Sequence, residues 1–116
     1  MKAENKELGF VGKPTKIKTN VLNQIINSNE IPVIAPLGIN LDSQVFNINA
    51  DTAACAIAKE LKARRLLIIS DVEGVLDKDK NLISEINSSK ANKMINNDVI
   101  SGGMIPKVNN CIDVAN

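Results

Sequence analysis

The residues best suited to chemistry lie around a glycine pair near the carboxyl-terminal end of the chain. Gly102 and Gly103 precede a segment with helical spacing, and Lys107 follows about one turn inside it. The first amides of a helix have no partner within the helix, and together with the helix dipole they attract anions. A lysine at that end opposes the dipole, so Lys107 either neutralises phosphate charge or is a solvated surface lysine. The spacing does not match a Walker loop.

A second candidate is the loop of residues 70–76, which follows the apolar run Leu66–Ile69. Ser70 and Asp71 could contact the ribose or the metal-bound phosphates of a nucleotide, and Gly74 lets the backbone approach a ligand closely. Ordinary turn chemistry explains the same residues, so their position alone leaves both interpretations open.

A third candidate lies where a predicted strand gives way to a predicted helix. Alternate residues of a strand face the same side, so Asn47 and Asn49 could together bind a carboxylate or amide of a small substrate. Asp51 would then stand at the positive end of the helix. In the alternative interpretation Asn49 caps the helix and Asp51 complements its dipole.

The composition narrows the possible chemistry further. The chain has 116 residues and no histidine, which excludes histidine triads, histidine general bases and nearly all catalytic zinc sites. Lysine, carboxylates, amides, hydroxyls or a metal held by oxygens remain, and no cluster of metal-ligating side chains is predicted. This set of groups favours phosphoryl transfer, which depends on positioning and on neutralising charge.

Charge and hydropathy exclude several kinds of partner. With 14 Lys and Arg against 13 Asp and Glu, and 2% aromatic residues, the chain suits neither bulk electrostatic binding nor base stacking of nucleic acid. No apolar run approaches the roughly 20 residues of a membrane span. Cys55 and Cys111 are expected to be free thiols in a reducing compartment, because no signal-peptide pattern is present.

The elements that must position these residues follow from the hydrophobic pattern. The length supports one domain, and the alternation of strands and helices predicts an α/β fold with a largely parallel sheet. Helices are expected from Thr19 or Asn20, over 50–63, over 89–96 with Ser88 as cap, and from Gly103 or Met104. We expect a turn at 12–14, a small hairpin over 77–86, and strands at 8–11, 15–18, 31–39, 45–48 and 66–69.

Five stretches of the chain resemble, in order, the acetylglutamate kinases of the amino acid kinase family. They are GFVGKPTKI, IPVIAPLG, NINADTAACAIAKEL, LLIISDVEGVLDKDKNLISEI and VISGGMIPKV, and together they cover almost the whole chain. The resemblance implies a three-layer αβα fold with an open, mostly parallel sheet. Residues 1–116 would be its nucleotide-binding part, without the N-terminal half that carries the substrate and phosphate-loop elements.

The same resemblance implies transfer of the γ-phosphoryl group of ATP, bound with magnesium, to the side-chain carboxylate of N-acetyl-L-glutamate in arginine biosynthesis. Lys107 would stabilise negative charge on the transferred group, and Asp51 would orient the catalytic lysines. Asn47 and Asn49 would bind the substrate. The residues that would contact ATP are Ser70, Asp71, Val72, Glu73, Gly74, Val75, Leu76, Val99, Ile100 and Ser101.

Relatives of nearly 300 residues are expected, with a glycine-rich phosphate loop and a second catalytic lysine that are not recognisable here. The chain alone is therefore expected to have little kinase activity, since several preorganised donors are missing. A non-catalytic nucleotide-binding or assembly fragment is the alternative. The resemblance also implies a homo-oligomer in the full-length enzyme, a nitrogen-status signalling protein as a further partner, and a location in the cytoplasm or the plastid stroma.

Overall fold

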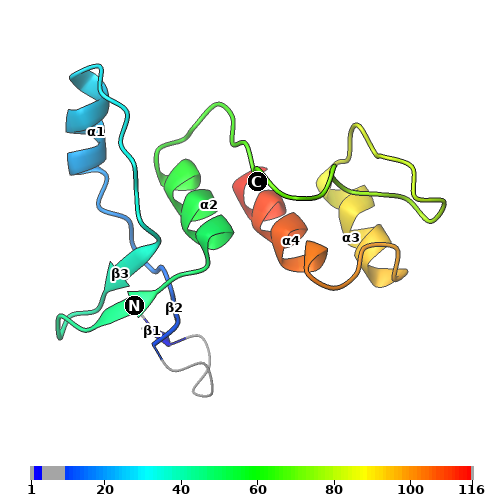
Figure 1. Ribbon diagram of the computed structural model, residues 1–116, viewed down its shortest axis with the longest axis horizontal. Helices are drawn as coiled ribbons and strands as arrows, with labels where there is room; N and C mark the ends of the chain where they lie inside the picture. The colour runs from blue at the N-terminus through cyan, green and yellow to red at the C-terminus, as the bar shows by residue number, and fades with distance from the viewer. Residues whose placement is uncertain (1, 4–9, 116) are drawn as a thin grey trace. The chain divides into compact units, whose positions relative to one another are not determined.

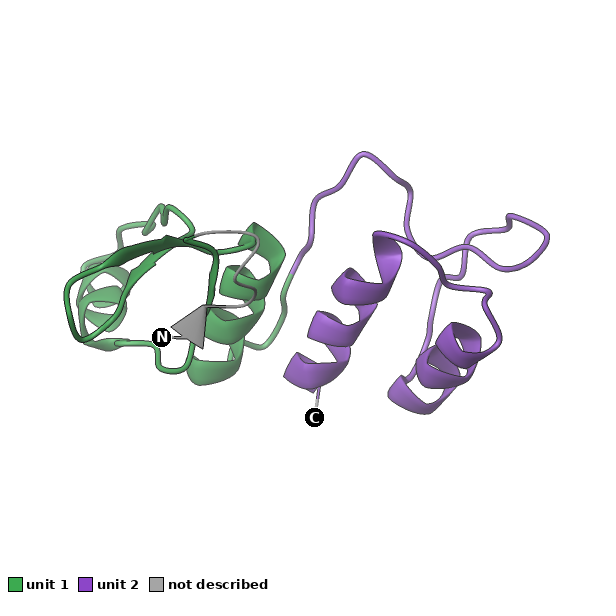
Figure 2. Ribbon diagram, turned by 90° about the horizontal axis from the view of Figure 1, so that it is seen from below, with its two compact units in different colours: residues 1–66 green, residues 67–116 purple. Residues whose placement is uncertain are grey.

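The chain divides into two compact units, Met1–Leu66 and Leu67–Asn116 (Figure 2). The structure, a computed structural model, describes residues 2–3 and 10–115. Each unit has helices and buried apolar residues of its own. The single domain expected over residues 1–116 stays a prediction. Among the described helices, none combines the length and the apolar character that crossing a membrane requires.

The strands of unit 1 form two small antiparallel pairs (Figure 1). β1 (Lys2–Ala3) pairs with β2 (Gly12–Lys13), and β3 (Leu37–Ile39) pairs with β4 (Val45–Asn47). One isolated parallel bridge links Val11 to Asn47. The α/β class is thus confirmed, but the ladders within the described residues are antiparallel rather than mostly parallel.

The hairpin of β3 and β4 is closed by the side chain of Asn40. Asn40 Oδ1 accepts the backbone N–H groups of Asp42 at 3.0 Å and Gln44 at 2.9 Å. The backbone N–H of Asn40 donates to the carbonyl of Gln44 at 3.1 Å. This is the side-chain-to-backbone bonding that makes asparagine a turn former. The strand predicted at 45–48 is confirmed over Val45–Asn47.

Two helices complete unit 1. α1 (Asn20–Asn27) begins after Thr19, as the sequence predicts. α2 (Ala50–Glu60) begins after Asn49, whose Oδ1 accepts the backbone N–H of Thr52 at 3.0 Å. The small residues Cys55 and Ala58 of α2 are buried and lie three residues apart on one face of the helix. Phe46 and Ile48 are also buried in this unit. Phe46 contacts Phe10 edge to face, with the ring centroids 6.2 Å apart.

Unit 2 contains a short hairpin and two contacting helices. Leu76 and Leu82 form an antiparallel bridge, followed by α3 (Ser88–Asn96) and α4 (Met104–Ala115). The cap of α3 is Asn87 rather than the predicted Ser88, and its Oδ1 accepts the N–H of Lys90 at 2.8 Å. The core consists of Ala91, Ile100 and Val108.

Several predicted strands differ from the structure. Of the predicted strand 31–39, only Leu37–Ile39 lies in a ladder, and 66–69 has no strand beside it among the described residues. Residues 15–18 form no strand, and Gly12 and Lys13 of the predicted turn belong to β2. Half of the predicted strand 8–11 lies outside the described residues. A strand needs a neighbouring strand for its hydrogen bonds, and sequence periodicity does not supply one.

Replacing Asn87 by alanine should destabilise unit 2. The substitution removes the cap that holds the N–H of Lys90, and loss of such a cap costs about 1 kcal/mol. Urea unfolding followed by circular dichroism measures the change in the free energy of unfolding. Asn92→Ala, an exposed position inside α3, is the matched control and should be neutral or slightly stabilising. Equal effects of the two substitutions would contradict the capping role.

The turn of residues 77–81, in which Asp77 accepts hydrogen bonds from Asp79 and Asn81, should loosen in acid. Hydrogen bonds from the backbone and side chain of Asn81, helped by the backbone of Asp79, hold the pKa of Asp77 below its ordinary value of 3.8. A carboxyl with a lowered folded pKa stabilises the turn above its unfolded pKa, and this contribution is lost as the pH falls through the folded pKa. The amide shifts of Asp79 and Asn81, followed by NMR from pH 5 downward, should report this transition. Asp77→Asn should abolish it, and a transition that survives the substitution would exclude Asp77 as its source.

Candidate functional site

The candidate site in unit 2 is a pocket of about 260 Å³ between the loop that follows Ile69 and helix α4. Two of the predicted groups meet there, because the loop residues 72–75 and Ser70 line the pocket together with Lys107. The other lining residues are Ile68, Ile86, Met104, Val108 and Cys111. The pocket therefore combines apolar walls with one lysine, one glutamate and one serine, which suits a ligand with an apolar body and an anionic end.

Helix α4 places Lys107 at this pocket through its periodicity. Val108 is buried in the core of unit 2, while Met104, Lys107 and Cys111 are spaced three and four residues apart. Residues at that spacing lie on one face of a helix. Lys107 is half-buried and takes part in an interaction with another group, so it is not a fully solvated surface lysine.

The glycine pair before α4 differs in part from the expectation. Gly102 has a φ of 55°, and a Cβ on Gly102 or Gly103 would meet no atom within 4 Å, so open space adjoins the pair. The first amides of the helix, however, are already used: Met104 N–H donates to the Ser101 carbonyl at 3.3 Å, and Ile105 N–H to the Gly102 carbonyl at 3.2 Å. The expectation that these amides are available for an anion is wrong for these two residues.

The loop after residue 69 begins with a hydrogen bond between two neighbouring side chains. Ser70 Oγ donates to Asp71 Oδ1 at 3.2 Å, and both residues are exposed. Gly74 has a φ of 150°, and a Cβ there would lie 2.9 Å from the Cδ1 of Leu82. The backbone conformation at Gly74 favours glycine, whereas the Leu82 methyl is the end of a flexible side chain that can move aside.

The stretch Val99–Ser101 lies beside this region but does not line the pocket. Ile100 is buried in the core next to Ala91 and Val108, and the N–H groups of Val99 and Ile100 both donate to the carbonyl of Met94. Ser101 is exposed. The side chain of Ile100 therefore serves packing, which the sequence pattern did not separate from a ligand contact.

The third predicted group lies in unit 1. Phe46 and Ile48 are buried, whereas Asn47 and Asn49 are exposed, as the two-residue period of a strand predicts. Asn49 is the cap of α2, and its Oδ1 also accepts the hydroxyl of Thr52 at 3.2 Å. Asp51 stands in the first turn of α2, half-buried and engaged with another group.

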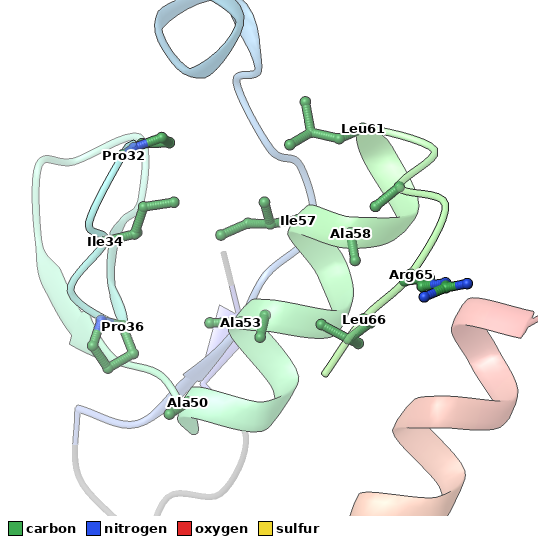
Figure 3. A pocket seen from close by; sticks show the side chains of 12 residues that line it. Pro32, Ile34, Pro36, Ala50, Ala53, Ile57, Ala58, Leu61, Arg65 and Leu66 are labelled. Carbon is green, nitrogen blue, oxygen red and sulfur yellow. The ribbon is translucent and has the colours of Figure 1, made fainter. Parts of the chain in front are cut away.

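Unit 1 also has a larger groove, of about 400 Å³, which contains none of the three predicted amide and carboxylate residues. Its walls are the extended segment around Ile34 and the apolar face of α2 (Figure 3). Arg65 also belongs to the lining. Nothing in its lining other than Arg65 is charged, so it carries none of the chemistry predicted for the site. Among the described residues, no group of three or more acidic or cysteine side chains could hold a metal ion.

The signal for the missed pocket residues was present in the sequence. Met104, Val108 and Cys111 follow the spacing that contains Lys107, so accepting Lys107 as a site residue implied a pocket wall formed by this face of the helix. The sequence did not indicate that Ile86 lines the pocket, because Ile86 stands in a loop whose course is not predictable from its residues.

Comparison with known proteins shows the family to which the chain belongs. The amino acid kinase family matches residues 1–116. The chain is 68% identical to the acetylglutamate kinase of Pelagibacter ubique over 112 residues, which are 97% of this chain and 39% of that protein. It is 56% identical to the acetylglutamate kinase of a Bradyrhizobium strain over 106 residues, or 91% of this chain and 36% of that protein.

A solved structure matches as well. The crystal structure of smu.665 from Streptococcus mutans superposes on 97% of this chain with a TM-score of 0.89 and 32% sequence identity, and the match covers 46% of that chain. The present chain thus spans less than half the length of these relatives. The match over its whole length and the identity to several kinases lead to one conclusion: this chain belongs to the amino acid kinase family.

Proposed function

We propose that this chain is the nucleotide-binding part of an acetylglutamate kinase, which transfers the γ-phosphoryl group of ATP to the side-chain carboxylate of N-acetyl-L-glutamate in arginine biosynthesis. One observation carries the proposal: a single pocket of unit 2 is lined by Ser70 and Val72–Val75 of the loop and by Lys107, although Asp71 does not line it. The name of the 68% identical relative supports the choice of substrate.

Lys107 is the residue that neutralises charge on the transferred group. It is half-buried at the mouth of an otherwise largely apolar pocket, where a charge interacts more strongly with a phosphate than it would in water. The exposed glycine pair nearby leaves room for the phosphates, because neither glycine has a neighbour where a Cβ would stand.

The loop after Ile69 contacts the rest of the nucleotide. Ser70 and Asp71 bind the ribose or the metal-bound phosphates, and the residues from Val72 to Leu76 approach through backbone and apolar contacts. Ile100 can contribute only its backbone, because its side chain is buried in the core. Magnesium usually binds through phosphate oxygens and one or two carboxylates, so it would arrive with ATP, and Asp71 is the suitable carboxylate.

The groups of unit 1 bind the acceptor substrate. The cap of α2 uses only the carbonyl oxygen of Asn49, and its NH₂ group can still donate to a carboxylate. Asn47 presents a second amide on the same side of the chain, and Asp51 orients lysine side chains. A carboxylate acceptor is ionised at neutral pH and is already a nucleophile, so the absence of histidine does not hinder the reaction.

The fold, the assembly and the cellular location of the proposed enzyme follow from the same family. The three-layer αβα arrangement with a mostly parallel sheet is part of this proposal, as are a homo-oligomeric enzyme and a nitrogen-status signalling partner. The named relatives come from bacteria, which supports the cytoplasm over a plastid.

Replacing Lys107 by alanine should weaken binding of magnesium ATP at least tenfold. A hydrogen bond to a charged group is worth about 1.5–3 kcal/mol, and about 1.4 kcal/mol corresponds to a factor of ten. Isothermal titration calorimetry of the 116-residue chain measures the dissociation constant, and Asp71→Ala should weaken it as well. Lys93→Ala, an exposed lysine of α3, is the matched control and should bind as the unaltered chain does.

The two candidate functions give different results in this titration. If the unaltered chain binds neither ATP nor N-acetyl-L-glutamate, the nucleotide-binding proposal fails and the assembly fragment is favoured. If Lys107→Ala and Lys93→Ala bind equally well, the site assignment fails even though a nucleotide binds.

ATP should protect Cys111 from modification. Cys111 is an exposed free thiol that lines the same pocket as Lys107, whereas Cys55 is buried in unit 1. A nucleotide in the pocket covers the Cys111 thiol, so saturating magnesium ATP should slow its reaction with an aromatic disulfide reagent at least fivefold. Cys111→Ser removes the fast-reacting thiol and identifies its signal. An unchanged rate at saturating nucleotide would place the ligand elsewhere.

A further inference from the structure

We propose that Leu37 determines the specificity of the acceptor site for the acyl group, and that its side chain packs against the acyl carbons of an N-acylated amino acid bound at Asn47. The inference deepens the proposed function and rests on it, because it takes Asn47 as a residue of the acceptor site. The other residues proposed for that site, Asn47, Asn49 and Asp51, are polar, so Leu37 is its apolar member.

The register of the β3–β4 hairpin places Leu37 directly opposite Asn47. One step along the ladder, the Ile48 N–H donates to the Pro36 carbonyl at 2.8 Å. Hydrogen-bonded pairs alternate with non-hydrogen-bonded pairs along an antiparallel ladder, so Leu37 and Asn47 form a non-hydrogen-bonded pair. The Cα atoms of such a pair are only about 4.5 Å apart, and both side chains stand on the same face.

A third side chain belongs to the same row. An isolated parallel bridge joins Val11 to Asn47, and the Asn47 N–H donates to the Phe10 carbonyl at 2.8 Å. Val11, Asn47 and Leu37 therefore stand side by side on one face, with the amide between two apolar side chains. Val11 is half-buried, whereas Leu37 is 58% exposed, so Leu37 offers the larger surface to a ligand.

The face that carries Asn47 continues as an apolar surface. Ile39 and Val45 form the next non-hydrogen-bonded pair on that face, and they are 63% and 52% exposed. The opposite face differs, because Gly38 carries no side chain and Phe46 is buried. Strand β3 thus presents its side chains only on the face of Asn47.

An N-acylated amino acid matches this arrangement. The Asn47 amide can hydrogen-bond a carboxylate or an amide carbonyl, while the acyl carbons of the same molecule need an apolar wall. A purely apolar partner would cover the Asn47 amide without giving it a hydrogen bond, which costs free energy. The 68% identical relative is named an acetylglutamate kinase, and an acetyl group ends in a single methyl.

The affinity of the 116-residue chain for a series of acyl lengths tests the proposal. N-formyl-, N-acetyl- and N-propionyl-L-glutamate differ by one carbon at each step, and NMR titration of the chain measures their dissociation constants. Each carbon that packs on Leu37 should tighten binding about two- to fourfold, from the usual gain per buried methylene. In Leu37→Ala the gain from formyl to acetyl should vanish, because alanine leaves the acyl methyl in water.

Matched variants separate this contact from a general effect on folding. Leu37→Ile keeps a branched apolar side chain and should retain the gain. Leu41→Ala, at the fully exposed tip of the same hairpin, should retain it as well. In the unaltered chain, a nuclear Overhauser effect should join the acetyl methyl protons of the ligand to the Leu37 methyl protons, which tests the contact without any substitution.

The outcomes distinguish this inference from the proposed function. If N-acetyl-L-glutamate shifts no resonance of Asn47, the acceptor site fails and the inference fails with it. If Asn47 responds but the gain per carbon survives in Leu37→Ala, or the Overhauser effect is missing, the acceptor site stands and the role of Leu37 is excluded. Leu37 resonances that shift with protein concentration alone would identify a second copy as the occupant of this face and overturn the proposal.

Discussion

The burial of Val108 against Ala91 and Ile100 is the contact on which the site of unit 2 depends. An α-helix turns about 100° per residue, so fixing Val108 in the core fixes the direction of Met104, Lys107 and Cys111 as well. These three residues then form one wall of the pocket, and the loop around Gly74 forms another. An apolar contact one residue away therefore fixes the direction of the lysine along the helix face.

Helix starts were predictable from the sequence because their signals are local. The starts of α1, α2 and α4 agree with the structure to about a residue, and the strand predicted at 45–48 follows the Asn40 turn as β4. The alternation of buried and exposed residues from Phe46 to Asn49 is also a local property. The meeting of Ser70 with Lys107 in one pocket required only that the loop and α4 belong to the same compact unit.

The strands predicted at 31–39 and 66–69 differ from the structure more than the helices do. Their apolar composition predicted buried strands, but residues 31–36 and 66–69 lie in no ladder of the described residues, and burial requires neighbours that these residues do not supply. The cap at Asn87 was displaced by one residue because serine and asparagine compete for this position on nearly equal terms. At Ile100 the interpretation as a ligand contact came from the resemblance alone, and packing determines the side chain.

The Asn40 side chain also determines the register of the β3–β4 hairpin. It sets how many residues separate the two arms of the hairpin, and hence which residue of β4 stands opposite Gly38. A slip of one residue would exchange the two faces of β4, turning Phe46 toward water and Asn47 toward the interior. The alternation of buried Phe46 and exposed Asn47 is thus encoded six and seven positions upstream, in the side-chain amide of Asn40.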